Sequence, residues 1–283
     1  MSKQRTLLFV GAHPDDETFG IGSTLAQYAT AGVKVYYACA TRGEAGTVAT
    51  ELMRGYATIA DLRWAELTCA AQVLGLTDVI YLGYRDSGMP GSVDNKHPEA
   101  LIAAPLEQIA GRIVKVIRQL KPEVIITSDP SGGYGHPDHI AIHKATIKAL
   151  QAAGDPEQYP EAGTAFQPQK LYFTVARYLR VLVKLAPFFG QNPRRFGRNK
   201  DIDLTKAAGV DLPVHASIRL TKQAIRTQDN ASNCYVSQLA GGPPRAGLLG
   251  IIRRLLGRRS VFMRAYPPVN GRLHEKDLFE GVT

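Results

Sequence analysis

The feature that most constrains the fold is an alternation of short apolar, β-branched runs with longer segments of helical pattern. The runs are TLLFVGA (6–12), VKVYYACA (33–40), DVIYLGY (78–84), EVIITSD (123–129) and KLYFTVA (170–176). The helical segments are Glu17–Ala31, Glu51–Leu74, Leu101–Gln119 and His139–Gln151. Strands that alternate with helices of this length indicate a mostly parallel sheet with helices on both faces. We therefore predict an α/β, Rossmann-like fold.

This pattern weakens after residue 176, but nothing there marks a domain boundary. A chain of 283 residues with 45% hydrophobic content can build one substantial core. We predict a single α/β domain over residues 1–283. Residues 1–176 would form the Rossmann-like core with the functional site, and residues 177–283 a less regular, basic part that completes the fold and the pocket.

The cysteines and the apolar runs bear on the compartment. Cys39, Cys69 and Cys234 are isolated and odd in number, so they suggest neither a disulfide framework nor a metal knuckle. We expect all three to be small buried hydrophobes. The chain starts without an apolar signal region and has no apolar run long enough to span a bilayer, so we predict a cytoplasmic protein.

The formal net charge of +9 lies in the second half of the chain. Residues 1–150 contain 14 Lys and Arg against 15 Asp and Glu, whereas residues 151–283 contain 20 against 10. The excess concentrates in Arg177–Lys200 and Arg245–Arg264, which contain no acid. Such a surface could attract nucleic acid, anionic lipid or an acidic substrate, or it could be a solvated face without a partner. Because no groove-reading motif is present, we expect no nucleic-acid partner.

Two polar segments with histidines follow the first and fourth predicted strands. GAHPDDE (11–17) follows the first strand, and SDPSGGYGHPDH (128–139) follows the fourth. In open α/β sheets ligands bind at the carboxyl ends of the strands, where the strand order reverses, and strands 1 and 4 are usually neighbours there. The sequence therefore predicts an active site that both segments line.

The acids of HPDDE exclude one kind of site and favour another. A dinucleotide site needs a glycine-rich turn, and carboxylates here would repel phosphate. A helix N-cap explains one acid, but not three together with a histidine. A divalent metal would offset the repulsion: His13 and Asp16 can converge on one ion, with Asp15 beside it. His136 or His139 can supply a third ligand, since catalytic zinc takes three protein ligands and a water.

Four motifs then resemble one known family. AHPDDE (12–17), TRGEAG (41–46), YRDSGM (84–89) and GGYGHPDH (132–139) resemble blocks of the zinc-dependent de-N-acetylases called LmbE-like and PIG-L-like proteins. The branch that acts on the thiol cofactor mycothiol, its precursor and its conjugates is the most similar. The resemblance implies one zinc per chain, or another divalent metal, and hydrolysis of acetyl from an N-acetylglucosamine-type sugar or glycoconjugate.

The resemblance also implies roles for the residues of the two loops. His13, Asp16 and His139 would bind zinc, Asp15 would be the general base, and His136 would assist as an acid or an electrostatic stabiliser. Zinc can lower the pKa of its bound water to about 7, and an adjacent carboxylate can take the proton.

By the same resemblance, Arg63 and Asp86 would hold substrate hydroxyls and Met89 would line the pocket. Pairing with Glu66 on the helix surface explains Arg63 equally well. Glu44, in a strand-end loop that faces the crevice, would support the site or be solvated.

The remaining aromatic and histidine residues are weaker candidates. Tyr134 would donate a hydrogen bond to the reacting oxygen, or it is a packed aromatic. His143 shares a helical face with His139, but a fourth ligand would displace the water, so we exclude it. Three further histidines have no ligand-like context: His97, His215 and His274.

The second half departs from the family and leaves alternatives open. The family commonly carries His followed by Ser-Gln or Thr-Gln in a later helix, whereas Leu220–Ser232 has Gln228 and no histidine. The alternatives are an amidase of a thiol-cofactor conjugate, a non-catalytic member of the fold and a nucleic-acid-binding protein.

Gly247–Arg259 has the pattern of a cationic amphipathic helix. Its apolar face would pack on the domain or on another copy in a homo-oligomer, or it would make a peripheral contact with an anionic membrane.

Overall fold

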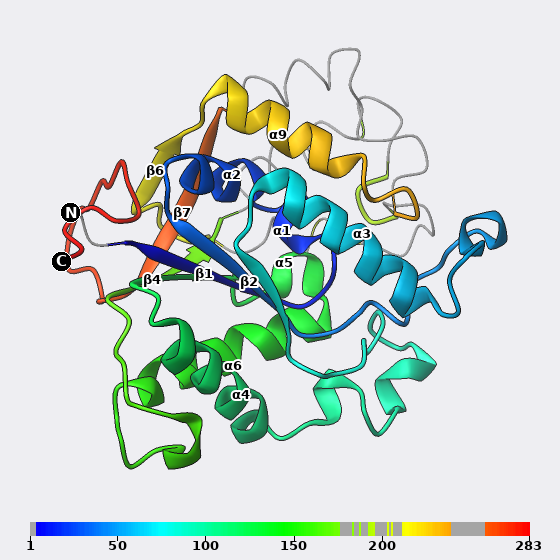
Figure 1. The fold of residues 1–283 in the computed structure, drawn as a ribbon, viewed down its shortest axis with the longest axis horizontal. Helices are drawn as coiled ribbons and strands as arrows, with labels where there is room; N and C mark the ends of the chain where they lie inside the picture. The colour runs from blue at the N-terminus through cyan, green and yellow to red at the C-terminus, as the bar shows by residue number, and fades with distance from the viewer. Residues whose placement is uncertain are drawn as a thin grey trace.

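The computed structural model describes residues 4–175, 211–238 and 258–283, with residues 183, 187, 192–195, 203 and 205 between them. Within these residues the chain forms a seven-stranded sheet in the order β3-β2-β1-β4-β5-β7-β6 (Figure 1). The strands are β1 (Thr6–Gly11), β2 (Lys34–Cys39), β3 (Asp78–Tyr81), β4 (Val124–Thr127), β5 (Lys170–Thr174), β6 (Ala216–Arg219) and β7 (Arg259–Tyr266). Strands β1 to β5 are parallel, and β7 pairs antiparallel with β5 and β6. The predicted α/β class and the β1–β4 neighbourhood are confirmed.

Helices cover both faces of the sheet, as predicted (Figure 1). One face carries α2 (Gly22–Thr30), α3 (Ile59–Leu74) and α9 (Lys222–Ser232), and α9 contacts both α2 and α3. The other face carries α4 (Leu106–Leu120) and α6 (Pro137–Ala153), which pack on each other. Short elements occupy the loops: α1 (Asp16–Phe19), α5 (Gly132–Gly135), η1 (Thr50–Met53), η2 (Val93–Lys96), η3 (Leu101–Ala103) and η4 (Pro160–Ala162).

The two helical layers create two cores, which β1 separates. Leu8 and Val10 pack into the core with α4 and α6, whereas Leu7 and Phe9 pack into the core with α2 and α3. Successive side chains of a strand point to opposite faces, so a strand buried on both faces is apolar throughout. This explains why the TLLFVGA run is continuous rather than alternating.

Several helix boundaries differ from the predictions. The expected helix Glu17–Ala31 is interrupted at Gly20 and Ile21 and forms α1 and α2. The helix expected over Glu51–Leu74 begins only at Ile59, where Thr58 and Asp61 form a capping box. The helix expected from Leu101 begins at Leu106, after Pro105 in an extended conformation.

The expectation for the cysteines was wrong for two of them. Cys69 on α3 and Cys234 after α9 form a disulfide, whereas Cys39 is a free, buried thiol as expected. The two half-cystines are 165 residues apart in sequence, and the packing of α9 on α3 brings them together. Their spacing alone carries no sign of this.

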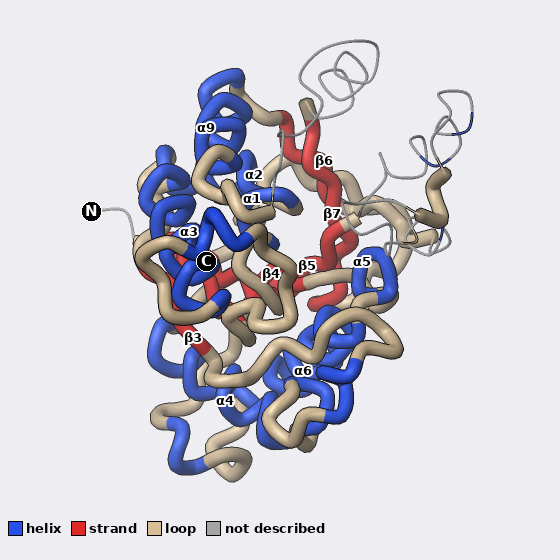
Figure 2. The backbone as a smooth tube through the Cα atoms, turned by 90° about the vertical axis from the view of Figure 1, so that its right-hand side faces the viewer, coloured by secondary structure: helices blue, strands red, loops and turns tan. Residues whose placement is uncertain are grey.

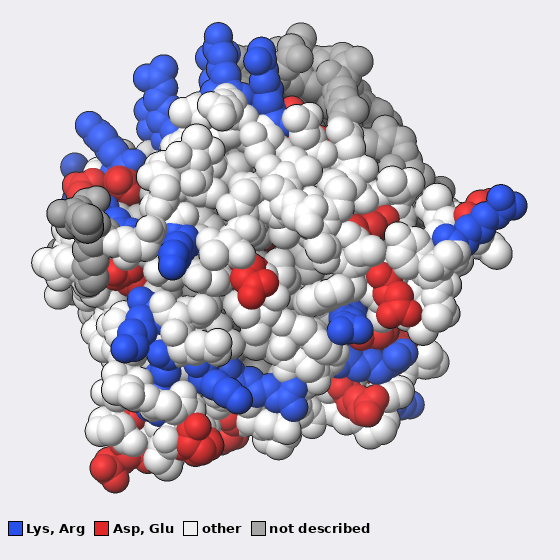
Figure 3. Space-filling view, in the orientation of Figure 1, with Lys and Arg blue, Asp and Glu red and all other residues white. Residues whose placement is uncertain are grey.

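The basic segments are only partly described. Residues 247–257 of the predicted amphipathic helix Gly247–Arg259 lie outside the described residues, so this helix stays a prediction. Most of Arg177–Lys200 also lies outside the described residues. Lys and Arg side chains project along the upper edge of the molecule in Figure 3, where α9 lies in Figure 1. Among the described residues, no helix is both long and apolar enough to cross a bilayer.

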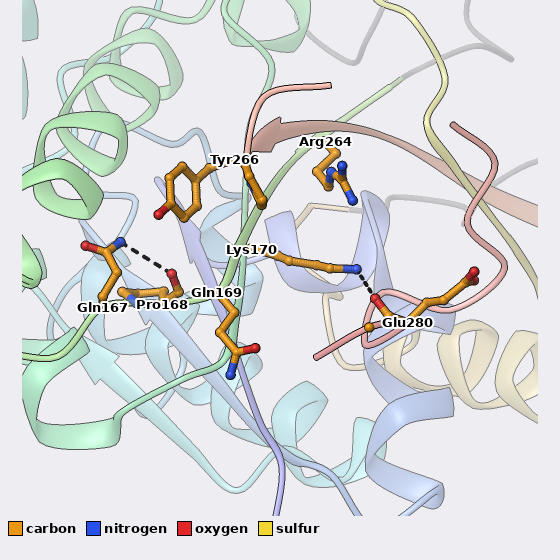
Figure 4. A pocket seen from close by; sticks show the side chains of 9 residues that line it. Gln167, Pro168, Gln169, Lys170, Arg264, Tyr266 and Glu280 are labelled. Atoms are coloured by element: carbon orange, nitrogen blue, oxygen red, sulfur yellow. Dashed lines mark hydrogen bonds between the residues drawn. The ribbon is translucent and has the colours of Figure 1, made fainter. Parts of the chain in front are cut away.

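A cavity of about 440 Å³ lies at the amino end of β5, opposite the predicted site (Figure 4). Lys170 points across it and donates to the backbone carbonyl of Glu280. Behind it, Glu275 accepts hydrogen bonds from Lys170 at 2.7 Å, from Arg264 at 2.8 Å and from the Tyr172 hydroxyl at 2.7 Å. This buried ionic cluster joins the C-terminal segment to the sheet.

Candidate active site

The two histidine-bearing loops meet beyond the carboxyl ends of β1 and β4. The first loop leads into α1 and the second contains α5, and Figure 2 views the molecule from this side. Because β1 and β4 are hydrogen-bonded neighbours, the loops that follow them start side by side.

Three side chains converge in the way a single metal ion requires. His13 Nδ1 lies 3.2 Å from His139 Nε2, which lies 3.3 Å from Asp16 Oδ1. Tetrahedral zinc, with bonds of about 2.0–2.1 Å, separates its ligand atoms by about 3.3–3.4 Å. Two of the three separations therefore match one such ion, and the ligand atoms of the third pair, His13 and Asp16, lie within 4.8 Å of each other.

The backbone holds Asp16 in this orientation. Its Oδ2 accepts the N–H groups of Ala12 at 2.8 Å and of His13 at 3.0 Å, which leaves Oδ1 to face His139. The Tyr37 hydroxyl donates to the His13 carbonyl at 2.6 Å. A Cβ on Gly11 would lie 2.9 Å from that hydroxyl oxygen and 3.1 Å from Asp16 Oδ2, so glycine is needed for this close approach.

The opposite nitrogen of His13 faces two buried carboxylates. Its Nε2 lies 3.2 Å from Asp138 Oδ2 and 3.3 Å from Asp86 Oδ1. Burial disfavours the charged ring, but Asp86 and Asp138 outweigh it and raise the pKa of His13. A carboxylate on the outer nitrogen fixes the tautomer and orientation of a ligating histidine. Asp138 is not among the residues predicted from the sequence, although its place between the histidines of HPDH is a signal.

Both carboxylates also belong to a second group of ligand atoms. His13, Asp86, His136 and Asp138 each offer a ligand atom within 4.8 Å of the others. Asp86 Oδ1 also accepts the N–H of Gly88 at 2.8 Å, and Asp138 Oδ2 that of Ser87 at 2.9 Å. This group and the first one share His13 through its two different nitrogens.

Asp15 lies beside the first group in an unusual backbone conformation. Its φ of 110° is in the left-handed region, which non-glycine residues rarely adopt. It occupies the N-cap of α1 without a side-chain capping bond, so capping does not explain this acid. Burial raises the pKa of Asp15 to about 7, and the charge of Arg63 opposes that rise.

Arg63 contacts this loop rather than Glu66. Its Nη2 lies 3.1 Å from Asp15 Oδ2 and donates to the Pro14 carbonyl at 2.6 Å. Glu66 instead accepts the backbone N–H and the hydroxyl of Ser237 at 2.7 and 2.6 Å. The alternative of an Arg63–Glu66 surface pair is therefore wrong.

Two further rings stand over the predicted ligands. The His136 ring centroid is 4.5 Å from that of His13, and the Tyr134 centroid is 5.9 Å from that of His139. Burial, together with the neighbouring histidines, lowers the pKa of His136 well below its usual value. Its Nδ1 accepts the N–H of Asp138 at 3.2 Å, so a neutral ring carries its proton on Nε2. Burial also raises the pKa of Tyr134, which keeps the hydroxyl protonated.

The residues predicted to bind substrate lie in adjoining loops. Glu44 accepts the backbone N–H of Asp86 at 2.9 Å, so it supports the loop that carries Asp86 to His13. Met89 is half-buried in the same loop, and its carbonyl accepts the N–H of Ser92 at 2.9 Å. His143 is buried, 2.8 Å from the Ser128 carbonyl oxygen, and packs on Phe173.

Glu17 was seen in the sequence only as one of three crowded acids. It is fully buried, and its Oε2 accepts the N–H of Asp15 at 3.0 Å. Its Oε1 accepts the Tyr235 hydroxyl at 2.7 Å, and the Thr18 hydroxyl also donates to it. On the same side, Gln228 of α9 donates to the Thr18 carbonyl at 2.7 Å.

Comparison with known sequences points to one family. The family model of GlcNAc-PI de-N-acetylase, called PIG-L, matches residues 8–150. Curated relatives from Streptomyces avermitilis and Geodermatophilus obscurus are both named 1D-myo-inositol 2-acetamido-2-deoxy-alpha-D-glucopyranoside deacetylase. The first is 42% identical over 60% of this chain and 60% of its own length, so this match spans less than two thirds of it. The second is 35% identical over 100% of this chain and 99% of its own length.

Solved structures share the fold. N,N'-diacetylchitobiose deacetylase from Pyrococcus horikoshii is 17% identical, with a TM-score of 0.61 over 93% of this chain and 84% of that one. A conserved protein from Thermus thermophilus is 21% identical, with a TM-score of 0.62 over 94% of this chain and 96% of that one. At these identities the likeness extends to the architecture alone.

Proposed function

The chain belongs to the GlcNAc-PI de-N-acetylase family, and we propose that it hydrolyses the acetamide of an N-acetylglucosamine-type glycoconjugate. The observation that carries this proposal is the convergence of ligand atoms from His13, Asp16 and His139, two pairs of them at the separation that tetrahedral zinc requires, close to the Asp15 carboxylate. The shared name of the relatives supports an N-acetylglucosaminyl inositol as the substrate, and it favours removal of acetyl over the amidase alternative.

We propose that the metal is one zinc ion per chain. His13 Nδ1, Asp16 Oδ1 and His139 Nε2 would hold it, and bound zinc would supply a Lewis acid that activates water and polarises the amide carbonyl. The second ligand group serves this site better as support, because Asp86 and Asp138 lie on the outer nitrogen of His13.

Asp15 would act as the general base. Its carboxylate takes a proton from the attacking water and later returns one to the amine that leaves. A pKa raised to about 7 suits this exchange, because the group can then both accept and release a proton near neutral pH. Arg63 orients this carboxylate and favours its charged form.

His136 and Tyr134 would donate hydrogen bonds to the oxygen of the tetrahedral intermediate. The Nδ1 of His136 already accepts a backbone N–H, so Nε2–H is its free donor. The Tyr134 hydroxyl, kept protonated by burial, is the second donor.

Substrate hydroxyls would bind near Asp86 and Arg63, with Met89 on the pocket wall and Glu44 as a support for Asp86. The predicted direct contacts with the sugar stay predictions, because Arg63 is engaged with Asp15 and with backbone carbonyls.

We also propose that residues 1–283 form one domain. Strands β6 and β7 extend the sheet that carries the site, and α9 packs on α2 and α3, which supports this. The cytoplasmic location stays a prediction. The Cys69–Cys234 disulfide bears on it, because disulfides are more frequent in exported proteins, and cell fractionation would test it.

Release of acetate tests the proposed function. The purified full chain is loaded with zinc and incubated with N-acetylglucosaminyl inositol, with N-acetylglucosamine and with an amide conjugate of a thiol cofactor, and the free amine is measured beside acetate, because hydrolysis of the conjugate releases an amine and an acid other than acetate. We expect fastest release from the first, loss of activity with a chelator and recovery on adding zinc. If the folded, zinc-loaded chain releases acetate from none of these compounds, the proposal is refuted.

A further inference from the structure

A buried carboxylate links the proposed base to the C-terminal part of the chain. Glu17 is completely buried, and each of its oxygens accepts a hydrogen bond from a different part of the chain. Oε2 accepts the backbone N–H of Asp15 at 3.0 Å, and Oε1 accepts the hydroxyl of Tyr235 at 2.7 Å. The contact with Tyr235 spans 218 residues of sequence.

The bond to Asp15 acts at the point where its backbone is least favourable. With a φ of 110°, Asp15 has a backbone conformation that residues other than glycine rarely adopt, so surrounding contacts must hold it there. Glu17 accepts the N–H of this same residue, while Arg63 holds the other end of Asp15, its carboxylate. The direction of the Asp15 side chain follows from both contacts.

Tyr235 is itself fixed from both sides. The preceding residue, Cys234, is joined to α3 by the disulfide with Cys69. Two residues later, Ser237 donates through its N–H and its hydroxyl to Glu66, also on α3. Tyr235 is fully buried between these two anchors, so its hydroxyl has little freedom to leave Glu17.

From these contacts we propose that Tyr235 and Glu17 are positioning residues for Asp15. Tyr235 holds the Glu17 carboxylate, and the carboxylate holds the Asp15 backbone in the conformation that points its side chain at the metal site. This inference rests on the proposed function, in which Asp15 is the general base. It gives Tyr235, in the C-terminal part, a role in the reaction although Tyr235 would neither bind the metal nor transfer a proton.

A purely structural role of the Tyr235–Glu17 bond must be separated from a positioning role. The chain offers a matched control in Tyr172, which is also fully buried and whose hydroxyl also donates to a buried carboxylate, Glu275, at 2.7 Å. That pair belongs to the ionic cluster of the C-terminal segment and contacts none of the proposed ligands. Tyr172→Phe and Tyr235→Phe therefore remove the same kind of bond in two places.

The test measures kcat, KM, zinc content and thermal midpoint on zinc-loaded full chains, with the acetamido sugar that the wild type cleaves fastest. For Tyr235→Phe we expect kcat to fall about tenfold or more, with KM within about twofold and one zinc retained, since the buried Glu17 oxygen loses the hydroxyl that fixes it. For Tyr172→Phe we expect the thermal midpoint to fall about as much as in Tyr235→Phe, whereas kcat stays within about twofold of the wild type. Unchanged kcat in Tyr235→Phe, or equal losses in both variants, would overturn the inference.

Two further variants keep the outcome interpretable. Glu17→Gln can still accept from Asp15 and donate to Tyr235, so it should retain more kcat than Glu17→Ala at equal zinc content. Wild-type activity and Asp15→Asn separate the inference from the proposed function: a zinc-loaded wild type without activity refutes the proposed function, whereas full activity in Asp15→Asn removes Asp15 as the base and the inference with it. If Asp15→Asn is inactive while Tyr235→Phe matches the wild type, only the positioning role fails.

Discussion

Breaking the Cys69–Cys234 disulfide should lower the stability of the chain by several kcal/mol. The bond closes a loop of 165 residues, and the chain-entropy relation gives about 5 kcal/mol for a loop of this length at 25 °C. Disulfides typically contribute about 2–4 kcal/mol, because the chain without the crosslink relaxes and keeps some structure. The entropic figure is therefore an upper bound for the loss.

The contacts around the disulfide indicate that the rest of the fold survives its loss. Ser237 still donates to Glu66, and α9 still packs on α2 and α3. The free energy of unfolding of a domain is typically about 5–15 kcal/mol. A loss of about 2–5 kcal/mol therefore leaves the chain folded for most values in that range. We expect a lower unfolding midpoint with one cooperative transition.

Denaturant unfolding of the wild type and of the Cys69→Ser, Cys234→Ser double variant measures this loss. A dithiol reductant should lower the midpoint of the wild type and leave the double variant unchanged, because Cys39 forms no disulfide. Thiol labelling of the denatured, unreduced wild type should modify one cysteine. Labelling of all three cysteines, or equal stability of the two proteins, would refute the reasoning.

Three further predictions concern the proposed active site. Alanine at His13, Asp16 or His139 should abolish tight zinc binding, since two ligands rarely hold zinc. Metal content after gel filtration measures this, and unchanged content in one variant would remove that residue from the set of ligands. Asp15→Asn should keep zinc but lose about 10²–10⁴-fold in kcat, and full activity would reassign the base. Gly43→Ala places a Cβ 2.0 Å from Arg63 Nη1 at a φ of +72°, so it should displace Arg63 and lower both kcat and the thermal midpoint; values equal to the wild type would contradict this geometry.

The convergence of the site could be predicted because it depends on local patterns and one topological rule. Apolar runs mark β1 and β4, and a parallel sheet places their following loops at the same edge. His13 and His139 each lie within a few residues of a segment whose structure the sequence indicates clearly. Their meeting required no knowledge of side-chain packing.

Other supporting contacts could not be predicted, because they depend on how helices pack on one another. Tyr235 reaches Glu17 over 218 residues of sequence. Cys69 and Cys234 look unrelated until α9 lies on α3. Whether Arg63 pairs with Asp15 or with Glu66 also depends on a distant residue, because Ser237 donates hydrogen bonds to Glu66.

These contacts divide the proposed site between the two parts of the chain. The groups proposed for chemistry lie between His13 and His139, within the segment that the family model matches. The C-terminal part contributes Tyr235 and Gln228, and both contact the short helix α1, which contains two of the crowded acids. Asp15, the proposed base, has a left-handed backbone conformation that needs support from other parts of the chain, since the backbone alone disfavours it. The C-terminal part thus supplies contacts that the conformation of Asp15 requires.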